Sequence, residues 1–174
     1  MTIATSVAQE EDAEGIAELF YKTWLATYPN EEYRVTVDDV NDRFKDRHSD
    51  AKLDKRRMEL RDPGNSRIFV AKDGNRIVGL CRVERKETRN SLSAIYVLPQ
   101  YQGRGLGKML WQAAEKFLDP SKDTYVGVAV YNDQAINFYK NRGFVDTGRR
   151  FTEERLELKS GANIPQMEMI LKHQ

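Results

Sequence analysis

The chain has 174 residues, of which 40% are hydrophobic and 32% charged, and its net charge is +1. This length and composition are typical of one soluble globular domain, expected to span residues 1–174. The near-neutral charge excludes a strong field for nucleic acid or an anionic membrane surface. No apolar run approaches the roughly 20 residues of a membrane span, and no signal-peptide pattern is present. A cytoplasmic location is therefore expected, with the single Cys81 interpreted as a small core residue rather than a catalytic thiol.

The first third of the chain predicts a short strand followed by helices. Residues 2–7 are expected to form the strand, and Asp12 is expected to cap a helix that ends at Pro29. Thr36 and Asp39 resemble a capping box with Asp in place of Glu, which predicts a second helix. The charged segment 45–61 is also predicted to be helical, although its apolar pattern is poor. The apolar stripe of the first helix comprises Ile16, Leu19, Phe20, Thr23, Trp24 and Thr27.

The middle of the chain predicts a hairpin and a third strand. After the turn signal at residues 62–65, strands at 67–71 and 76–84 are joined by a Gly-centred turn that suits a tight hairpin. A third strand at 92–98 ends at Pro99. A Gly-rich loop and a helix over 105–118 follow.

The last third predicts a strand at 125–130, a helix that Asn132 caps and Gly143 ends, and closing strands at 144–158 and 166–171. Hairpins imply antiparallel pairing, whereas the strand-helix-strand unit implies a right-handed crossover and a parallel pair. We therefore expect an α/β (α+β) domain. It would have a mixed, mostly antiparallel sheet of about seven strands, with a central parallel pair and helices on both faces.

The glycine loop between the third strand and its helix is the clearest functional signal. A helix start presents unpaired N–H groups and a partial positive charge, and glycines let the backbone approach a phosphate. Two basic side chains add charge at the same end. The loop comprises Gln102, Gly103, Arg104, Gly105, Leu106, Gly107 and Lys108.

Other interpretations of this loop fit less well. A P-loop needs Ser or Thr after the lysine, where this chain has Met109. A dinucleotide fingerprint needs Gly-x-Gly-x-x-Gly and a second βαβ half. A purely structural glycine turn leaves the flanking basic residues unexplained.

At these residues the sequence resembles the GCN5-related N-acetyltransferase (GNAT) family, whose Gln/Arg-x-x-Gly-x-Gly/Ala signature is matched in full by residues 102–107. The preceding Ile95-Tyr96-Val97-Leu98-Pro99 and the later Asn132 with Tyr139-Lys140-Asn141-Arg142-Gly143-Phe144 also look like family motifs. The resemblance covers about residues 66–148, and before them only the order of elements is similar. The part of the chain that carries these motifs is also similar to the bacterial spermidine/spermine acetyltransferase branch.

The resemblance implies the GNAT fold and acetyl-CoA as cosubstrate. In this family the strands at 92–98 and 125–130 part at their C-terminal ends, and the pantetheine arm pairs with backbone in the gap. Its partners here would be Ile95, Tyr96 and Val97, with the Val97 N–H holding the developing oxyanion. The diphosphate would bind residues 102–108.

Asn132 and Tyr139 are seven residues apart and share a helix face. The resemblance implies that Asn132 contacts the pantetheine and that the Tyr139 hydroxyl protonates the leaving thiolate. From the residues alone, Asn132 could be only a cap and Tyr139 only a core residue beside Phe138 and Phe144.

At the position of the general base, this sequence differs from related enzymes. Ribosomal-protein alanine acetyltransferases carry a Glu five residues before the matching Asn, where this chain has Gly127. The strand at 91–98 has no carboxylate either. The base is therefore a water chain or an acid from elsewhere, such as Glu84, or is absent.

The acceptor side is implied by resemblance to lie along residues 24–42. Carboxylates with aromatic rings suit a cationic amine such as a polyamine, although a solvated acidic helix face explains them equally well. The residues concerned are Tyr28, Glu31, Glu32, Tyr33, Asp38, Asp39 and Asp42.

We therefore expect an N-acetyltransferase that moves the acetyl group of acetyl-CoA to a primary amine by direct transfer in a ternary complex. The alternatives are a peptide or ribosomal-protein acetyltransferase, a non-catalytic acyl-CoA-binding module, and a nucleotide-phosphate binder. No metal site is expected, because the two histidines, His48 and His173, lie far apart in sequence. The sequence leaves open whether the chain forms a homodimer.

Overall fold

The structure, a computed structural model, describes residues 3–153 and 157–173. Within these residues one seven-stranded sheet has the order β1-β2-β3-β4-β5-β7-β6. The strands are β1 (Ile3–Val7), β2 (Ser66–Asp73), β3 (Arg76–Arg85), β4 (Asn90–Val97), β5 (Thr124–Ala129), β6 (Val145–Phe151) and β7 (Gln166–Leu171). Only the β4–β5 pair is parallel, so the predicted fold class is confirmed.

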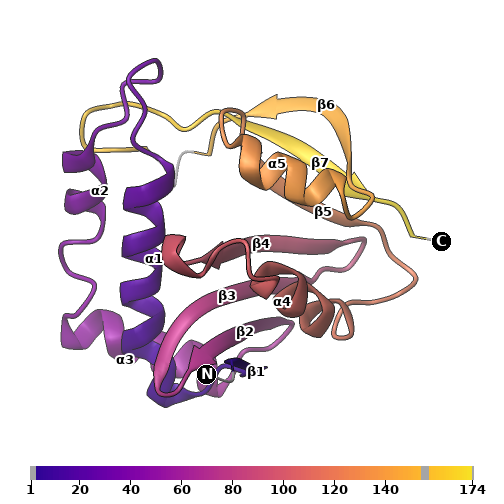
Figure 1. Cartoon of the computed structure of the whole chain (residues 1–174), viewed down its shortest axis with the longest axis horizontal. Helices are drawn as coiled ribbons and strands as arrows, with labels where there is room; N and C mark the ends of the chain where they lie inside the picture. Colours follow the sequence, from indigo (N-terminus) through magenta and orange to yellow (C-terminus); the bar gives the residue numbers. More distant parts are fainter. Residues whose placement is uncertain (1–2, 154–156, 174) are drawn as a thin grey trace.

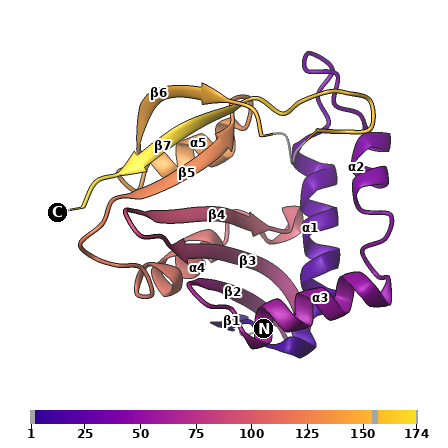
Figure 2. The same ribbon diagram turned by 180° about the vertical axis from the view of Figure 1, so that it is seen from behind.

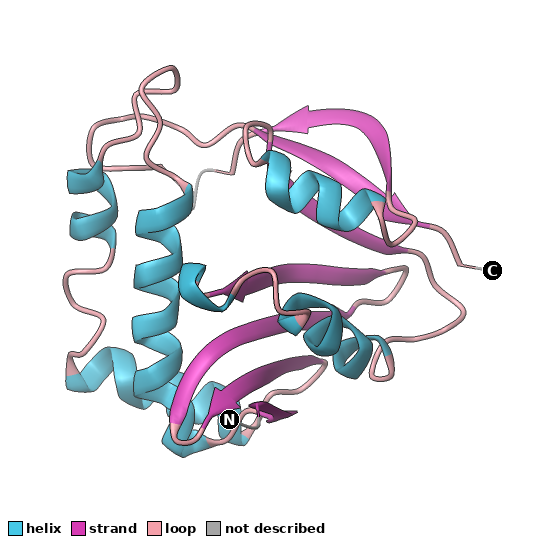
Figure 3. Cartoon of the chain, viewed as in Figure 1, coloured by secondary structure: helices cyan, strands magenta, loops and turns pink. Residues whose placement is uncertain are grey.

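Helices lie on both faces of the sheet (Figures 1 and 3). α4 packs on β2 and β3 from one side, whereas α1 packs on β3 and β4 and is itself flanked by α2 and α3 (Figure 2). None of the helices among the described residues has the length and apolar composition needed to span a bilayer. The helices are α1 (Ala13–Thr27), α2 (Val37–Arg43), α3 (Asp50–Arg61), α4 (Leu106–Glu115) and α5 (Asp133–Lys140), with short 3-10 turns η1 (Glu10–Asp12) and η2 (Pro99–Tyr101).

The parallel pair is short. β4 and β5 are paired only from Asn90 to Leu92 and from Thr124 to Val126, and beyond these residues the two strands diverge (Figures 1 and 2). A register shift between β3 and β4 falls at the same place, between Arg82 and Val83. Because a bulge bends the strand that carries it, the irregularity turns the rest of β4 away from β5. Among the described residues, β4 consequently forms no ladder with β5 from Ser93 onward.

Helix starts follow the predicted capping with one exception. Thr36 accepts from the Asp39 amide at 3.1 Å, Asp39 bonds back to the Thr36 amide at 2.9 Å, and Asn132 accepts from the Ala135 amide at 3.1 Å. The prediction that the Asp12 side chain caps α1 is wrong. That carboxylate instead accepts from the Gln9 amide at 2.9 Å and pairs with Lys72 at 2.6 Å, because the chain already begins to coil at η1.

The strand predicted over 144–158 is shorter than expected. β6 ends at Phe151, residues 154–156 of the prediction lie outside the described residues, and Leu158 is buried outside any strand. The pairing partner explains the boundary, because Phe151 pairs with Gln166 and the residue before Gln166 is Pro165, which has no N–H for a ladder.

Two clusters of buried side chains hold these layers together. The larger joins α1 and α4 to the sheet and includes Cys81, whose side chain is fully buried as expected. Burial raises the pKa of the Cys81 thiol, so it remains protonated and inert. The smaller cluster includes Trp24 of α1, Val40 of α2 and Ile164, which precedes β7.

Candidate active site

Beyond its pairing with β5, the edge of β4 presents the Val97 amide to the gap between β4 and β5. In an antiparallel ladder, successive residues direct their N–H and C=O groups alternately toward and away from the partner strand. The Leu98 amide donates to Val78 of β3 at 2.9 Å, so the Val97 groups point away from β3. The Val97 carbonyl accepts from Gln102 Nε2 at 3.0 Å. No acceptor for the Val97 N–H is found in the described part of the chain, so this donor faces the gap.

The glycine loop leads directly into α4. Gly105 has a φ of 80°, a left-handed conformation that Gly adopts easily, and it forms the N-cap of α4. Among the described residues, none bonds to the backbone amides of residues 103–108. Gln102 is held in turn by Gln134 of α5 at 3.0 Å, so the loop is tied to both β4 and α5. These amides lie at a helix start, where the sequence analysis predicts an anion site.

Tyr139 is almost completely buried two turns along α5 from Asn132. Its ring contacts Phe138 and Phe144, with centroid distances of 5.5 Å in each case. Burial, with a smaller contribution from the Cys81 thiol, raises the pKa of the Tyr139 hydroxyl. The hydroxyl is therefore protonated at neutral pH and available as a proton donor.

One cavity of about 320 Å³ connects these groups. It runs from the glycine loop, past the β4 edge and α5, to the C-terminal half of α1. Every residue that the sequence analysis assigned to the cofactor lines it except Arg104, whose guanidinium lies over the Tyr101 ring at 5.3 Å. The lining residues are Thr23, Ala26, Thr27, Ile95, Tyr96, Val97, Pro99, Tyr101, Gln102, Gly103, Gly105, Leu106, Gly107, Lys108, Asn132, Gln134, Ala135, Phe138, Tyr139 and Arg142.

The cavity fits a phosphate-bearing thioester. Its charged lining residues, Lys108 and Arg142, are both basic. The Arg142 guanidinium lies 3.4 Å from the centroid of Phe138 and donates from Nη1 to the Phe138 carbonyl at 2.9 Å, but its buried Nε has no hydrogen-bond partner within the described part of the chain. Since buried donors are normally paired, an orphan N–H at the wall favours an acceptor group on a ligand.

Neither Glu84 nor the position of Gly127 supplies a carboxylate to this chemistry. Glu84 pairs with Ser91, at the opposite end of β4 from Val97, and its side chain is paired with Lys86 at 3.6 Å, so the suggestion that it is the base is wrong. At Gly127 a Cβ would lie 2.6 Å from the Gln166 side-chain oxygen and 3.0 Å from the Phe151 ring. The place of a carboxylate on β5 is therefore filled by an amide and a ring.

The sequence analysis did not assign several of the cavity-lining residues to the site. Thr23 and Thr27 belong to the predicted apolar stripe of α1, where hydroxyls at a spacing of four were the available signal. Arg142 lies within the family motif, but nothing in its spacing indicates that it reaches the cavity. The contact of α1 with the gap depends on tertiary packing.

A mixed seven-stranded sheet with a diverging parallel pair, a glycine-rich helix start and a connecting cavity defines an acyl-CoA transferase type of fold. A model of the acetyltransferase (GNAT) domain matches residues 7–160. The chain belongs to the GNAT acetyltransferase family, as its resemblance to the family's motifs predicts.

Individual proteins extend this comparison. An uncharacterized N-acetyltransferase of the pepI 3' region in Lactobacillus delbrueckii subsp. lactis is 33% identical over 110 residues, which are 58% of this chain and 61% of that relative. The match therefore spans less than two thirds of that relative's length.

Solved structures show the same fold at low identity. PaiA N-acetyltransferase from Thermoplasma acidophilum, in complex with coenzyme A, has a TM-score of 0.67 and 21% identity over 97% of this chain and 98% of its own. YncA from Salmonella typhimurium, with its cofactor acetyl-CoA, has a TM-score of 0.62 and 19% identity over 100% of this chain and 95% of its own.

Proposed function

We propose that the chain transfers the acetyl group of acetyl-CoA to a primary amine by direct attack in a ternary complex. The observation that carries the proposal is one cavity that joins the free Val97 amide, the amides of the glycine loop and the Tyr139 side chain. Acetyl-CoA supplies the activated acetyl group. Neutral amines are sufficient nucleophiles for a thioester, so the protein must orient the reactants and stabilise charge.

Backbone amides, two basic side chains and Tyr139 have separate roles in this transfer. The glycine-loop amides, with Lys108 and Arg142, hold the diphosphate. The Val97 N–H donates to the oxygen on which negative charge develops. As the C–S bond breaks, Tyr139 Oη donates its proton to the leaving sulfur, and the proton that the amine nitrogen loses on forming the amide restores the Tyr139 hydroxyl through solvent. Burial raises the pKa of Tyr139, so the hydroxyl carries its proton before the transfer.

Tyr139→Phe tests the proton donor. The change removes one hydroxyl and keeps the ring packing, so kcat is expected to fall roughly 10- to 100-fold with little change in the affinity for acetyl-CoA. The measurement is CoA release with a panel of amines and N-terminal peptides. Tyr125→Phe is the control, because Tyr125 lies on β5 beside Arg89 and outside the cavity. Equal kcat for Tyr139→Phe and the parent protein would remove Tyr139 from the mechanism.

A second candidate is an acyl-CoA-binding module without turnover. The cavity lining among the described residues contains no carboxylate and no imidazole, which favours this alternative. Calorimetry with acetyl-CoA, ATP and NAD separates it from a nucleotide binder, and the amine panel separates it from the enzyme. Tight acetyl-CoA binding with no CoA release on any amine would favour the binding module.

A further inference from the structure

The end of the cavity opposite the glycine loop is formed by α1 and Tyr96. Thr23, Ala26 and Thr27 line it from the helix, and Tyr96 lines it from β4. An acceptor that attacks beside Val97 must reach the cavity from this end, since Lys108, Arg142 and the loop amides occupy the other. The inference below rests on the proposed acetyl transfer.

Two tyrosine hydroxyls meet at this end. Tyr28, the residue after α1, and Tyr96 bring their hydroxyl oxygens to 2.9 Å. Burial, followed by the neighbouring Tyr96, raises the pKa of Tyr28, and Tyr139 also contributes. The Tyr28 hydroxyl therefore stays neutral at neutral pH.

Aromatic packing holds both rings in place. Phe20 meets Tyr96 edge-on with centroids 5.6 Å apart, and Trp24 contacts Tyr28 at 4.4 Å. Tyr131 donates from its hydroxyl to the Tyr28 carbonyl at 2.9 Å. The Tyr28–Tyr96 pair is therefore rigid, as a substrate-positioning group needs to be.

The acidic residues of the acceptor segment do not line this end. Asp39 is buried and bonds Thr36 and Ser160, and Asp42 pairs with Lys45 at 3.1 Å. The others, Glu31, Glu32 and Asp38, are exposed and absent from the cavity.

The charged groups that contact the aromatic wall are instead guanidiniums. Arg43 lies 4.7 Å from the Trp24 ring centroid and Arg56 lies 5.4 Å from that of Phe20. Within the described part of the chain, a polycation would meet no carboxylate in the cavity lining.

We propose that Tyr96, held by Tyr28, forms the acceptor subsite and selects a primary amine carried on a neutral, apolar or aromatic body. The Tyr96 hydroxyl can accept a hydrogen bond from an amine N–H, which leaves the nitrogen lone pair free for attack. The rings and the methyl groups of α1 bury the body of such an amine, and a polyamine would find no counter-charge among the described residues that line the cavity.

The first test measures binding without turnover. Calorimetry of the protein loaded with coenzyme A is expected to show tyramine binding at least 10-fold tighter than spermidine. Tyr96→Phe is expected to weaken tyramine binding about 10-fold and Tyr28→Phe about threefold, with a smaller change in coenzyme A affinity, because the pantetheine arm would pair with the backbone of β4 and not with the Tyr96 hydroxyl. Tyr21→Phe is the matched control, because Tyr21 lies on α1, two turns before Tyr28, but bonds Asn41 outside the cavity.

The second test measures turnover, where Tyr96→Phe is expected to raise the KM for tyramine about 10-fold and to change kcat much less. Tighter binding of spermidine than of tyramine, or equal tyramine binding by Tyr96→Phe and Tyr21→Phe, would overturn the inference. Tyramine binding that follows the expected pattern without CoA release from any amine would instead overturn the proposed acetyl transfer and leave the subsite supported.

Discussion

Gly105 serves both the start of α4 and the anion site. Its φ of 80° is strained for a residue with a Cβ, yet a Cβ there would contact nothing within 4 Å. Gly105→Ala is therefore expected to lower the free energy of unfolding by about 1 kcal/mol through backbone strain alone. The same strain should turn the loop amides and weaken acetyl-CoA binding several-fold, as measured by calorimetry and denaturant unfolding.

Gly64 provides the control for that substitution. It also has a positive φ, 53°, with nothing within 4 Å of an added Cβ, but it lies in the turn before β2. Gly64→Ala should cost similar stability and leave acetyl-CoA binding unchanged. Equal losses of binding in the two variants would show that the loop geometry is not specific to the ligand.

Residues differ in how far the sequence could predict their role. Gln102, Asn132 and Tyr139 stand in local motifs, so the sequence placed them at a shared site before any fold was known. The Tyr28–Tyr96 contact joins positions 68 apart, and only the packing of α1 on β4 brings their hydroxyls together. Gln166 beside Gly127 is likewise a long-range contact that no local pattern encodes.

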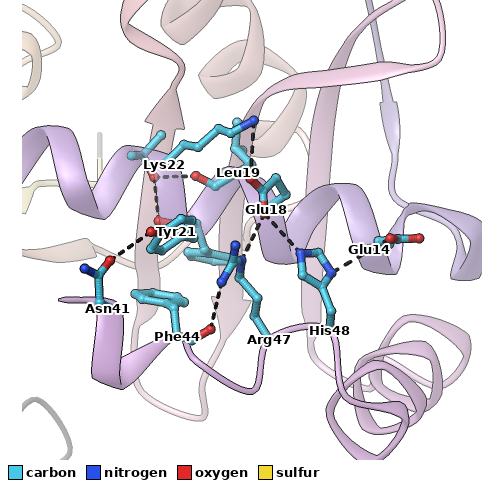
Figure 4. Close-up of polar contacts among 11 residues, drawn as sticks. Glu14, Glu18, Leu19, Tyr21, Lys22, Asn41, Phe44, Arg47 and His48 are labelled. Atoms are coloured by element: carbon cyan, nitrogen blue, oxygen red, sulfur yellow. Dashed lines mark hydrogen bonds and ion pairs between the residues drawn. The ribbon is translucent and has the colours of Figure 1, made fainter. Parts of the chain in front are cut away.

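At the scale of elements, α1 is anchored on its outer face by Glu18 (Figure 4). Its carboxylate pairs with Arg47 at 2.9 Å and His48 at 3.1 Å, both from the segment between α2 and α3, and with Lys22 at 3.3 Å. Burial acts to raise the pKa of Glu18, but the hydrogen bonds from Arg47, His48 and Lys22 outweigh it and lower the pKa to about 2. The opposite face of α1 lines the cavity.

Glu18→Gln is expected to lower the free energy of unfolding by about 1–2 kcal/mol at pH 7, because the pairs are partly exposed and screened. Since the folded pKa is depressed from 4.5 to about 2, this stabilisation is complete above about pH 5 and is lost as the pH falls toward 2. Urea unfolding of both proteins across that range should show the difference shrinking.

Glu14→Gln is the matched substitution one turn earlier on α1. The Glu14 side chain is 71% exposed and lies 3.8 Å from His48, so its loss should change stability by less than about 0.5 kcal/mol at any pH. A difference between Glu18→Gln and the parent protein that stays constant from pH 5 to pH 2 would contradict the assignment of the low pKa.

The ends of the helices and strands were predicted correctly where local contacts set them and wrongly where tertiary contacts did. The Thr36–Asp39 capping box was correctly predicted because both its partners are local. Asp12 stands where a cap is expected, but its interaction with Lys72 of β2 is a tertiary contact that sequence patterning does not reveal. The end of β6 is set by Pro165 on the opposite strand, again a distant residue.

At the scale of the whole molecule, the sheet has two halves that share few backbone pairs. The mixed pairing could be predicted from element order, but the insertion of β7 between β5 and β6 could not, because it depends on long-range pairing. The halves meet through the short β4–β5 pairing and through Asn90, which is 1% exposed. Asn90 Nδ2 donates to the carbonyls of Asp119 and Lys122 at 2.8 and 3.0 Å, and its Oδ1 accepts from the Asp119 amide at 3.1 Å.

Asn90→Ala is expected to lower the free energy of unfolding by about 2–4 kcal/mol, because it leaves backbone groups of the α4–β5 connection without partners at a buried position. Asn75→Ala, in the exposed β2–β3 turn, should change it by less than about 0.5 kcal/mol. Because a ligand that binds only the folded state stabilises it by mass action, acetyl-CoA at 100 times its Kd should add about 2.7 kcal/mol to the free energy of unfolding of Asn90→Ala and of the parent protein alike. Thermal unfolding with and without acetyl-CoA measures the stability that the substitution removes and the stability that the ligand adds. Stability of Asn90→Ala equal to that of Asn75→Ala would mean that the three backbone pairs alone hold the halves together.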